Sequence, residues 1–550
     1  MAIEINNSRS LLLRNVSRMG YVVAVQTKMI TEIVVFLLTS LIVYFIYIHK
    51  SIHKYFDDRG IKYLPGVPFF GNNLRSSFLK VHVLEDLEAV YKAFPEERYV
   101  GYIEGTTKII IIRDPEVMRN ITVKDFQHFT DHKTFVSEDS EPLFGRSLFF
   151  MKGERWHSMR TTLSPAFTSS KMKLMMPFMS EISTNIVEYL KGHVNEDVDV
   201  QDLMRRYTND VIASAAFGLP VNSVKDRDNE FFTIGRDLFS FTFFQKIYAI
   251  LVALFPNFMK KLGITVFPKK VINFFKGIVV NTMQNREKNN IHRPDMIQLL
   301  MEASKGILKD ESDTNGNKSQ NNEASKQKPI KEWSVEELSS QVFIFFAAGY
   351  ESSASTLVMC VHELALNPDV QEKLYQEIKE YKEKHGEITF EHIHNLKYLD
   401  CVLSETSRKW STVLVLDRTC TLPYELPPPR EGLKPVQVKP GDIVYNMVIC
   451  IHKDPNHHPN PEKFDPERFS DENKHKIKPF TYMPFGMGPR NCIGIRFAQL
   501  ELKILIFDIV SNYKIVKCTK TMDPVVLKPH AFNLQPRDGS IVRFVPRHDN

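Results

Sequence analysis

The stretch Phe485-Gly-Met-Gly-Pro-Arg-Asn-Cys-Ile-Gly494 places one cysteine among three glycines and an arginine. Its cysteine, Cys492, binds a metal only as the thiolate, so nearby groups have to stabilise a negative charge. The glycines let backbone amides approach a sulfur atom or a flat cofactor without obstruction by side chains. The pattern therefore indicates a cysteine that holds a metal or a cofactor.

Two neighbouring features support this interpretation. Arg490, two residues before the cysteine, can pair with a carboxylate of a cofactor. The run Phe497–Phe507 has helical spacing, which puts Cys492 near a helix N-terminus, where a thiolate is favoured. A buried structural cysteine in a glycine turn explains most lone cysteines, but it does not explain the whole ten-residue pattern.

Weaker motifs precede this stretch. The helical motif Glu405-Thr-Ser-Arg408 places an acid and a base on one face, and Pro466-Glu-Arg-Phe469 follows it. Similarly, Trp156-His-Ser-Met-Arg160 places an aromatic ring and a base on one face. The motif Ala348-Gly-Tyr-Glu-Ser352 lies inside the apolar run Val342–Leu366. Each motif alone has an ordinary explanation, such as a solvated surface pair or a buried helix with a tolerated glycine.

Taken in this order, the motifs resemble a known family. The pattern F-x-x-G-x-R-x-C-x-G is the haem-binding signature of the cytochromes P450, and the chain matches its defined positions at Phe485, Gly488, Arg490, Cys492 and Gly494. The resemblance extends over residues 60–546. Two further stretches, Thr162–Lys171 and Arg293–Leu300, look like the insect microsomal branch, which is related to vertebrate drug-metabolising members.

The resemblance implies a mainly α-helical fold with a smaller β-rich lobe, and haem b as the cofactor. Cys492 would be the axial ligand of the haem iron, and thiolate ligation favours O–O cleavage. A structural triad behind the haem would consist of Glu405, Arg408 and Arg468. The remaining haem contacts would come from Phe485, Gly488 and Gly494, and the haem propionates would be neutralised by Trp156, Arg160, Arg418 and Arg490.

The resemblance also assigns the motif at 348–352 to oxygen chemistry. Ala348 and Gly349 would leave room over the haem, where a local distortion of the helix could hold water. Glu351 and Ser352 would relay protons to bound oxygen as an acid–alcohol pair. Most family members have threonine in place of Ser352, and serine lacks the rotamer restriction of a β-branched residue. We therefore hypothesise looser coupling of electrons to product.

A second departure follows the E-x-x-R motif, where the family usually has an aromatic residue and then proline. Here the sequence is Lys409-Trp-Ser-Thr412, so the turn into the next segment is less constrained. We expect that segment, Val413–Leu416, to face the substrate. Apolar lining is also expected from Phe135–Phe150, Phe231–Phe244, Phe343–Glu351 and His530–Leu534, and such a lining fits many apolar compounds.

The N-terminal region predicts a membrane anchor. Ile33–Ile48 contains no charged residue and no small-residue cleavage site follows it, which disfavours a signal peptide. Basic residues follow the run, which favours a cytoplasmic C-terminal side. We expect an extension at 1–28, an anchor at 29–49, a basic and Pro/Gly linker at 50–72, and a catalytic domain at 73–550 with a flexible insert at 304–331. One hypothesis is that translation begins at Met29.

Local patterns give further expectations. Ser334 and Glu337 form a capping box at a helix start, and Lys108–Arg113 has the pattern of a buried strand. The segment 231–275 is rich in phenylalanine. Two explanations of it stay open: ordinary core, or a surface that dips into the bilayer.

Composition excludes several classes of protein. The 550 residues contain 71 basic and 65 acidic residues, interspersed along the chain, which does not indicate nucleic-acid binding. A mean hydropathy of −0.23 excludes a polytopic membrane protein. The six cysteines have no zinc-site spacing and are expected to be reduced thiols.

Together these features predict a membrane-anchored haem-thiolate monooxygenase that inserts one atom of O2 into small apolar substrates. The resemblance implies electrons from NADPH through NADPH–cytochrome P450 reductase, with cytochrome b5 as a second partner, and a catalytic domain on the cytoplasmic face of the endoplasmic reticulum membrane. Basic residues that could dock the reductase are Lys474, Lys476, Lys478 and Arg496. The alternatives are an oxygen-independent haem-thiolate isomerase or lyase, and an inert haem-binding protein that sequesters hydrophobic ligands.

Overall fold

The structure is a computed structural model. It describes residues 2–78, 80–134, 138, 141–239, 261, 267–304, 333–529, 531 and 533–547, with side chains from residue 26 onward, residue 304 excepted. The predicted flexible insert at 304–331 therefore lies, apart from its first residue, outside the described residues.

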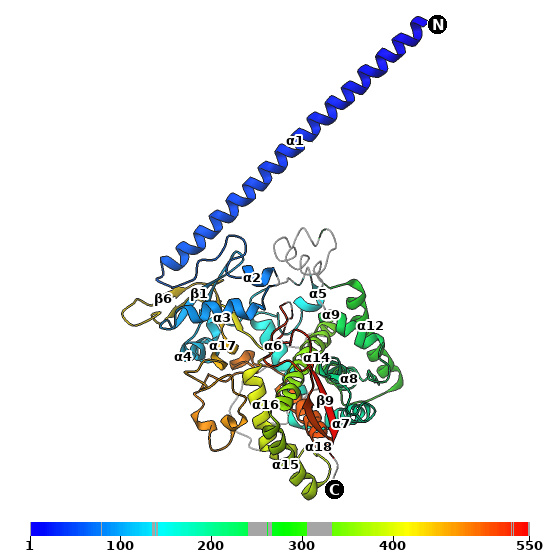
Figure 1. The fold of residues 1–550 in the computed structure, drawn as a ribbon, viewed down its shortest axis with the longest axis vertical. Coiled ribbons are helices and arrows are strands. Elements are labelled where there is room, and N and C mark those ends of the chain that lie inside the picture. Colours follow the sequence, from blue (N-terminus) through cyan, green and yellow to red (C-terminus); the bar gives the residue numbers. More distant parts are fainter. Residues whose placement is uncertain are drawn as a thin grey trace, which may run out of the picture.

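A body of helices carries a smaller lobe that contains strands, and α1 projects from the side of this lobe (Figure 1). This arrangement confirms the predicted fold class. The α-helices are α1 Ala2–Asp57, α2 Leu74–Ser77, α3 Val83–Ala93, α4 Pro115–Arg119, α5 Pro142–Gly145, α6 Gly153–Leu163, α7 Ser169–Lys191, α8 Val200–Ala215, α9 Glu230–Phe239, α12 Lys269–Asn289, α13 Met296–Ser304, α14 Val335–Leu366, α15 Pro368–His385, α16 Lys397–Lys409, α17 Val448–His452 and α18 Ile495–Asn512.

The strands form three sheets, with the orders β1-β2-β7-β4, β3-β9-β8 and β5-β6. The strands are β1 Tyr99–Glu104, β2 Thr107–Ile112, β3 Val198–Asp199, β4 Leu416–Thr419, β5 Tyr424–Leu426, β6 Val436–Val438, β7 Ile443–Asn446, β8 Tyr513–Lys517 and β9 Ile541–Pro546. Short π or 3-10 turns are η1 Asn120–Lys124, η2 Phe126–His128, η3 Ser164–Phe167, η5 Ile393–Asn395, η6 Pro466–Phe469, η7 Lys474–Lys476 and η8 Gly488–Arg490.

The first sheet fixes the position of one predicted site residue. The predicted strand at Lys108–Arg113 is β2, whose last four residues are buried. β7 runs parallel to β2 and pairs antiparallel with β4. This register sets Arg418 of β4 opposite Val444 in the interior of the sheet, where the Arg418 side chain is fully buried.

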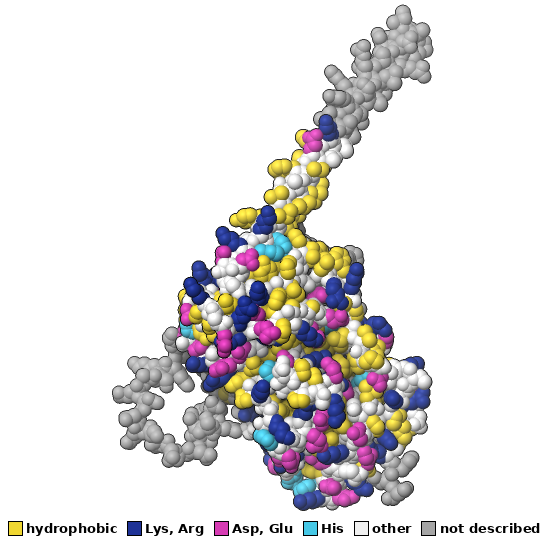
Figure 2. All heavy atoms as spheres, turned by 60° about the vertical axis from the view of Figure 1, so that its left-hand side comes forward, with side chains coloured by type: hydrophobic (Ala, Val, Ile, Leu, Met, Phe, Trp, Pro, Cys, Tyr) yellow, Lys and Arg dark blue, Asp and Glu magenta, His cyan; other side chains and the backbone are white. Residues whose placement is uncertain are grey.

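α1 is a single helix that extends on both sides of the predicted anchor. Its part from Gln26 to Asp57 is long and apolar enough to cross a membrane, and its most apolar window is fully exposed. Figure 2 shows this part as a largely hydrophobic rod. The C-terminal end docks on the body, because Phe56 is buried beside Gly101 of β1. A Cβ atom at Gly101 would lie 2.7 Å from the Phe56 ring, so only glycine allows this contact.

α14 is the central helix of the body. It begins with the predicted capping box, in which the Ser334 hydroxyl accepts from the Glu337 amide (3.2 Å) and the Glu337 carboxylate accepts from the Ser334 amide (3.1 Å). The helix is also long and apolar enough to cross a membrane, but most of it is buried against α8, α12 and α18. It is therefore a core helix.

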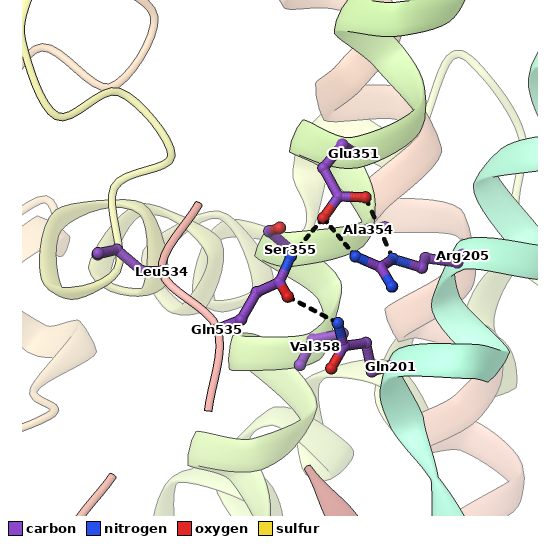
Figure 3. Close-up of a pocket in the computed structure, with 8 residues that line it drawn as sticks. All are labelled: Gln201, Arg205, Glu351, Ala354, Ser355, Val358, Leu534 and Gln535. Atoms are coloured by element: carbon purple, nitrogen blue, oxygen red, sulfur yellow. Dashed lines mark hydrogen bonds and ion pairs between the residues drawn. The ribbon is translucent and has the colours of Figure 1, made fainter. Parts of the chain in front are cut away.

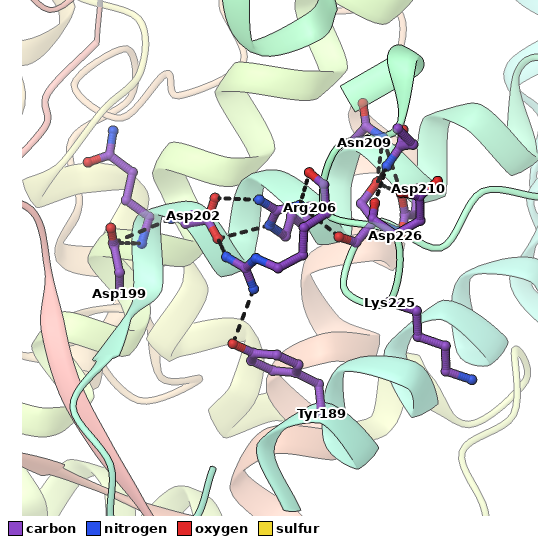
Figure 4. Close-up of polar contacts among 12 residues, drawn as sticks. Tyr189, Asp199, Asp202, Arg206, Asn209, Asp210, Lys225 and Asp226 are labelled. Carbon is purple, nitrogen blue, oxygen red and sulfur yellow. Dashed lines mark hydrogen bonds and ion pairs between the residues drawn. The ribbon is translucent and has the colours of Figure 1, made fainter. Parts of the chain in front are cut away.

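A polar network fastens α8 to the loop that follows it (Figure 4). Arg206 pairs with Asp202 (2.8 Å) and donates to the carbonyl oxygens of Ser223 and Arg227. Asp210 accepts from both the amide and the hydroxyl of Ser223. Burial raises the pKa of Asp210 to about 6, against the lowering effect of these hydrogen bonds. The loop is thus held to α8 by side chains that are themselves buried.

The aromatic segment contributes to the core where the structure describes it. Phe231 of α9 and Phe275 of α12 are buried, and both rings contact Phe346 of α14 at centroid distances of 5.3 and 5.0 Å. These contacts favour the first of the two explanations for the described part. Residues 240–260 and 262–266 lie outside the described residues.

Candidate active site

The cysteine stretch forms a tight loop before α18. Gly494 is the N-cap residue of α18, so Cys492 lies two positions before the N-cap, and the Cys492 amide donates to the carbonyl oxygen of Phe485 at 2.8 Å. Gly488 has a φ of +70°, and a Cβ atom there would lie 1.9 Å from the carbonyl oxygen of Thr122. Only glycine can occupy this position without moving the loop.

Cys492 is the most exposed of the six cysteines, since Cys518 is half-buried and the other four are buried. Solvent reaches the Cys492 side chain. The surrounding protein nevertheless excludes enough water for burial to have the largest effect on the pKa of the thiol. Burial raises the pKa of Cys492, while the Gly494 amide and the Arg160 guanidinium lower it. The sequence analysis expected the helix terminus to favour the thiolate; in the structure burial outweighs that effect. A bound metal ion deprotonates a coordinating thiol outright.

Arg490 is buried against backbone oxygens. Its guanidinium donates to the carbonyl oxygens of Thr130 (2.9 Å) and Met151 (2.7 Å) and lies 4.0 Å over the Trp156 ring. Burial and the neighbouring Arg418 lower the pKa of Arg490 to about 9. The structure thus brings Arg490, Arg418 and Trp156 together, as the family resemblance implied.

Arg418 is the least satisfied of these cations. It is fully buried, and its Nη1 atom donates to the carbonyl oxygen of Asp417 at 2.7 Å. Among the described residues, its Nε and Nη2 atoms have no hydrogen-bond partner. Burial lowers the pKa of Arg418 to about 10. A buried donor without a partner costs about 1–3 kcal/mol, so these two nitrogen atoms are suited to an anionic ligand.

The second residue of the W-x-x-x-R motif holds the cysteine loop. Arg160 of α6 donates to the carbonyl oxygen and the side-chain oxygen of Asn491, both at 2.8 Å. Asn491 directly precedes Cys492, so Arg160 brings a positive charge close to the sulfur. Burial lowers the pKa of Arg160, and the nearby Cys492 raises it.

One face of α14 is open although most of the helix is buried. Ala348 is exposed and Ser352, one turn later, is half-exposed. Phe345, one turn earlier, contacts the Phe167 ring at 5.4 Å, and a Cβ atom on Gly494 would lie 3.8 Å from that ring. This chain of contacts directs the open face of α14 toward the Cys492 loop.

The other residues of the 348–352 motif make different contacts. A Cβ atom on Gly349 would lie 2.8 Å from Ile212 of α8, so this glycine permits close packing of two helices. α14 is helical from Val335 to Leu366 without a break, in contrast to the local distortion that the sequence analysis expected. The Ser352 hydroxyl donates back to the Ala348 carbonyl oxygen. This bond keeps the hydroxyl within the helix groove.

Glu351 points toward Arg205 and Gln535 (Figure 3). It is buried, and its carboxylate accepts from Arg205 of α8 at 2.8 and 3.1 Å and from the Gln535 side-chain amide. Sequence reasoning missed Arg205 and Gln535, because nothing in their local pattern distinguishes them from surface residues.

The E-x-x-R residues form a buried ion-pair cluster. Arg408 donates to both oxygens of Glu405 at 2.7 and 2.9 Å, and the Arg468 Nε atom lies 3.4 Å from Glu405. Arg408 also donates to the carbonyl oxygens of His452 and Pro461. The structure therefore brings the three predicted triad residues together and joins them to the segment that leads into the cysteine loop.

The turn without proline is held by side chains instead. The Trp410 indole donates to Glu363 at 2.7 Å, and the Ser411 hydroxyl bonds to both the amide and the carbonyl of Val413. The following residues, Val413–Val415, are half-buried. Of the other expected lining segments, parts of 135–150, 231–244 and 530–534 lie outside the described residues.

Comparison with known proteins agrees with this geometry. The family model of cytochrome P450 matches residues 62–543. Cytochrome P450 9e2 of Blattella germanica is 41% identical over 88% of this chain and 93% of its own length. Probable cytochrome P450 9f2 of Drosophila melanogaster is 40% identical, over 90% and 96%, and cytochrome P450 6k1 of Blattella germanica is 34% identical, over 89% and 93%.

The chain therefore belongs to the cytochrome P450 family. Its relatives are insect P450 proteins of the groups 9 and 6, and it is an oxidoreductase, a monooxygenase that uses haem b and receives electrons from NADPH through a redox reductase.

The described residues fit a haem with a thiolate ligand. The Cys492 side chain is exposed, and among the described residues two nitrogen atoms of the buried Arg418 lack a partner, which a haem carboxylate would supply. Within the described residues, no group of three or more His, Cys, Asp or Glu side chains could hold a bare metal ion. A haem iron needs only the one protein ligand that Cys492 offers.

Proposed function

We propose that the chain is an anchored monooxygenase of small apolar compounds whose haem is held between the Cys492 loop and the open face of α14. The observation that carries this proposal is the exposed thiol of Cys492, which Arg160 and Arg490 connect to the unsatisfied Arg418 and which the Phe167–Phe345 contact connects to the open face of α14. When bound, the haem supplies the oxygen chemistry, in which one atom of O2 enters the substrate and the other leaves as water.

Each site residue has a proposed task. Cys492 ligates the iron, and Phe485, Gly488 and Gly494 shape the loop around the sulfur. Carboxylates of the haem are neutralised by Arg418 directly, with Trp156, Arg160 and Arg490 around it. The triad of Glu405, Arg408 and Arg468 fastens α16 to the chain before the loop and has no contact with the reacting atoms.

The residues proposed to supply protons lie on α14. Ser352 is half-exposed on the open face, and Glu351 lies at the preceding position of the helix, where it is bonded to Arg205 and Gln535. We therefore assign Ser352 to the donation of a proton on the ligand side and Glu351 to its replacement. Ala348, which is exposed, leaves space beside them, whereas Gly349 packs against Ile212 of α8. Apolar side chains of Val413–Leu416 exclude water on the substrate side.

The membrane arrangement is inferred from α1. The exposed apolar part of this helix supports a single-pass anchor, with 29–49 in the bilayer, 1–28 before it and the catalytic domain from 73 onward. The basic residues that follow the apolar run support a catalytic domain on the cytoplasmic face of the endoplasmic reticulum membrane.

Basic side chains near the Cys492 loop support a docking surface for NADPH–cytochrome P450 reductase and for cytochrome b5. Lys476, Lys478 and Arg496 are exposed. Lys474 is exposed as well, but it pairs with Asp471 at 2.7 Å, so it contributes less charge to a partner. Attraction of an acidic partner to such a surface weakens as ionic strength rises.

The deciding experiment is the difference spectrum of the reduced protein with carbon monoxide. We expect a strongly red-shifted thiolate-type band in the wild type, its loss in Cys492→Ala, and its retention in the control Cys518→Ala. A band that survives in Cys492→Ala, or a haem-bound wild type without the band, would overturn the assignment.

A further inference from the structure

A buried histidine, His452, lies between the E-x-x-R cluster and the segment that leads into the Cys492 loop. It is the last residue of α17, and its side chain is fully buried. Its carbonyl oxygen accepts from the Arg408 guanidinium at 2.8 Å. Its imidazole ring packs against the Tyr482 ring at a centroid distance of 5.5 Å. His452 therefore contacts the cluster through its backbone and the segment before the loop through its side chain.

The His452 ring accepts a hydrogen bond from the backbone of that segment. Its Nε2 atom lies 2.9 Å from the Met483 amide nitrogen. A backbone amide can only donate, so Nε2 is the acceptor and the proton of the neutral ring is on Nδ1. The Nδ1 atom faces the carbonyl groups of Arg408 and Ser407, without a hydrogen bond of normal geometry among the described residues. Burial, together with the nearby His458 and Arg408, lowers the pKa of His452 well below its usual range, which keeps Nε2 available as an acceptor.

The Met483 amide is close to the start of the cysteine loop. The carbonyl oxygen of Met483 accepts from the Gly486 amide at 3.1 Å, and the carbonyl oxygen of Phe485 accepts from the Cys492 amide at 2.8 Å. Pro484 lies between Met483 and Phe485, and its fixed φ limits how far one of them can move without the other. The position of the Met483 amide therefore affects where the loop begins.

The two residues before Met483 are held by other partners. The Tyr482 hydroxyl donates to a carbonyl oxygen of α16 at 3.1 Å, and the His458 Nε2 atom donates to the carbonyl oxygen of Thr481 at 3.0 Å. Three successive residues are thus fixed from three directions. Of these three contacts, the one from His452 is nearest to the cysteine loop.

We propose that His452 is a positioning residue for the proposed iron ligand, and that its Nε2 atom holds the Met483 amide and thereby sets the geometry of the Cys492 loop. The inference rests on the proposed ligation by Cys492. The two ends of the loop are then held by different side chains. His452 holds the beginning through Met483, and Arg160 holds the end through Asn491, at 2.8 Å from both its carbonyl and its side-chain oxygen.

The test compares His452→Gln with His452→Asn in the full-length holoenzyme in lipid vesicles. Glutamine extends far enough to place an oxygen near the Nε2 position. The oxygen of the shorter asparagine ends near the Nδ1 position and leaves the Met483 amide without an acceptor. Should His452→Asn yield no holoenzyme, His452→Met takes its place, because methionine fills the volume without offering a comparable acceptor.

The first readout is hydrogen exchange of the Met483 amide, resolved by fragmentation in the mass spectrometer. In His452→Asn we expect this amide to exchange about tenfold faster than in the wild type, the equivalent of one buried hydrogen bond. In His452→Gln we expect the exchange rate to stay close to the wild-type value, since the acceptor is kept.

The second readout is the thiolate-type band of the reduced protein with carbon monoxide, followed during incubation in mild urea. The rate at which this band is lost is divided by the rate at which the helical circular dichroism is lost, so that global unfolding cancels. We expect this ratio to rise by about tenfold in His452→Asn and to stay near the wild-type value in His452→Gln.

The matched control is His362→Asn. His362 is also fully buried, but its ring bonds to the Met522 carbonyl oxygen at 2.9 Å and to the Ser540 hydroxyl at 3.0 Å, in another part of the chain. We expect this variant to be less stable overall, with a wild-type exchange rate at Met483 and a wild-type ratio of the two losses.

The outcomes separate the positioning role from general loosening. Equal behaviour of His452→Gln and His452→Asn would overturn the proposal, because the place of the acceptor would then not matter. A raised ratio in His362→Asn would overturn it too. Fast exchange at Met483 beside an unchanged ratio in His452→Asn would overturn the link from Met483 to the cysteine. A haem-bound wild type without the thiolate-type band would show instead that the proposed ligation by Cys492 fails.

Discussion

Glu501 of α18 gives a quantitative prediction about stability and pH. Its side chain is fully buried, and no basic side chain among the described residues forms an ion pair with it. Burial raises the pKa of Glu501 from 4.5 to about 8, against a small lowering effect of Ser353. The folded protein therefore holds Glu501 as the neutral acid over much of the physiological range, whereas the unfolded chain ionises it.

The direction of the pH dependence of stability follows from proton linkage. Between the two pKa values the folded state binds more protons than the unfolded state, so the free energy of unfolding falls as pH rises. The contribution of Glu501 is complete below about pH 4.5 and lost as pH passes 8. Between the two pKa values, each pH unit lowers the free energy of unfolding by about 1.4 kcal/mol. The loss between pH 5.5 and pH 8 is therefore about 3 kcal/mol.

The perturbation is Glu501→Gln, which keeps the shape and removes the charge. We expect the free-energy difference between the variant and the wild type, measured by urea unfolding, to change by about 3 kcal/mol in favour of the variant between pH 5.5 and pH 8. The contributions of the other titrating groups are the same in both proteins and cancel in the difference between their free energies of unfolding. Glu383→Gln, on the exposed face of α15, should keep the wild-type slope. Parallel pH dependences for Glu501→Gln and the wild type would refute the reasoning.

Three further substitutions have defined outcomes. Gly488→Ala would force a Cβ atom against the Thr122 carbonyl oxygen at a positive φ, so the yield of CO-binding holoenzyme should collapse, and a wild-type yield would contradict the loop geometry. Arg408→Lys cannot keep both hydrogen bonds to Glu405 and should lower the free energy of unfolding in urea by about 3–5 kcal/mol. A loss of less than about 1 kcal/mol would show that the cluster is dispensable for stability. Arg418→Met should speed haem loss to apomyoglobin about tenfold, equivalent to one charged hydrogen bond, whereas unchanged retention would exclude contact with a propionate.

Local sequence was sufficient where chemistry depends on neighbouring residues. The loop around Cys492, the capping box at Ser334 and the pairing of Glu405 with Arg408 follow from spacings of a few positions, and short spacings map directly onto helices and turns. The same reasoning predicted α14 and the buried strand β2.

Contacts between distant segments were beyond that reasoning. Gln535 and Arg205 meet at Glu351 from positions 184 and 146 residues away, and no local pattern encodes such a meeting. The missing proline after Trp410 was visible, but its replacement by a hydrogen-bonded Ser411 depends on the folded turn. The burial of the Cys492 thiol, which opposes the effect of the helix terminus, is likewise a property of the whole loop environment.

The continuity of α1 determines how the domain stands on a membrane. The apolar run Ile33–Ile48 covers about 24 Å at about 1.5 Å per residue, somewhat less than a hydrocarbon core of about 30 Å. The helix then continues without a break to Asp57, about 13 Å further, and Phe56 locks its end beside Gly101. The proposed anchor is thus a rigid connection and not a flexible one. In the proposed membrane arrangement, a helix that is continuous to Asp57 would fix the height and tilt of the catalytic domain relative to the bilayer.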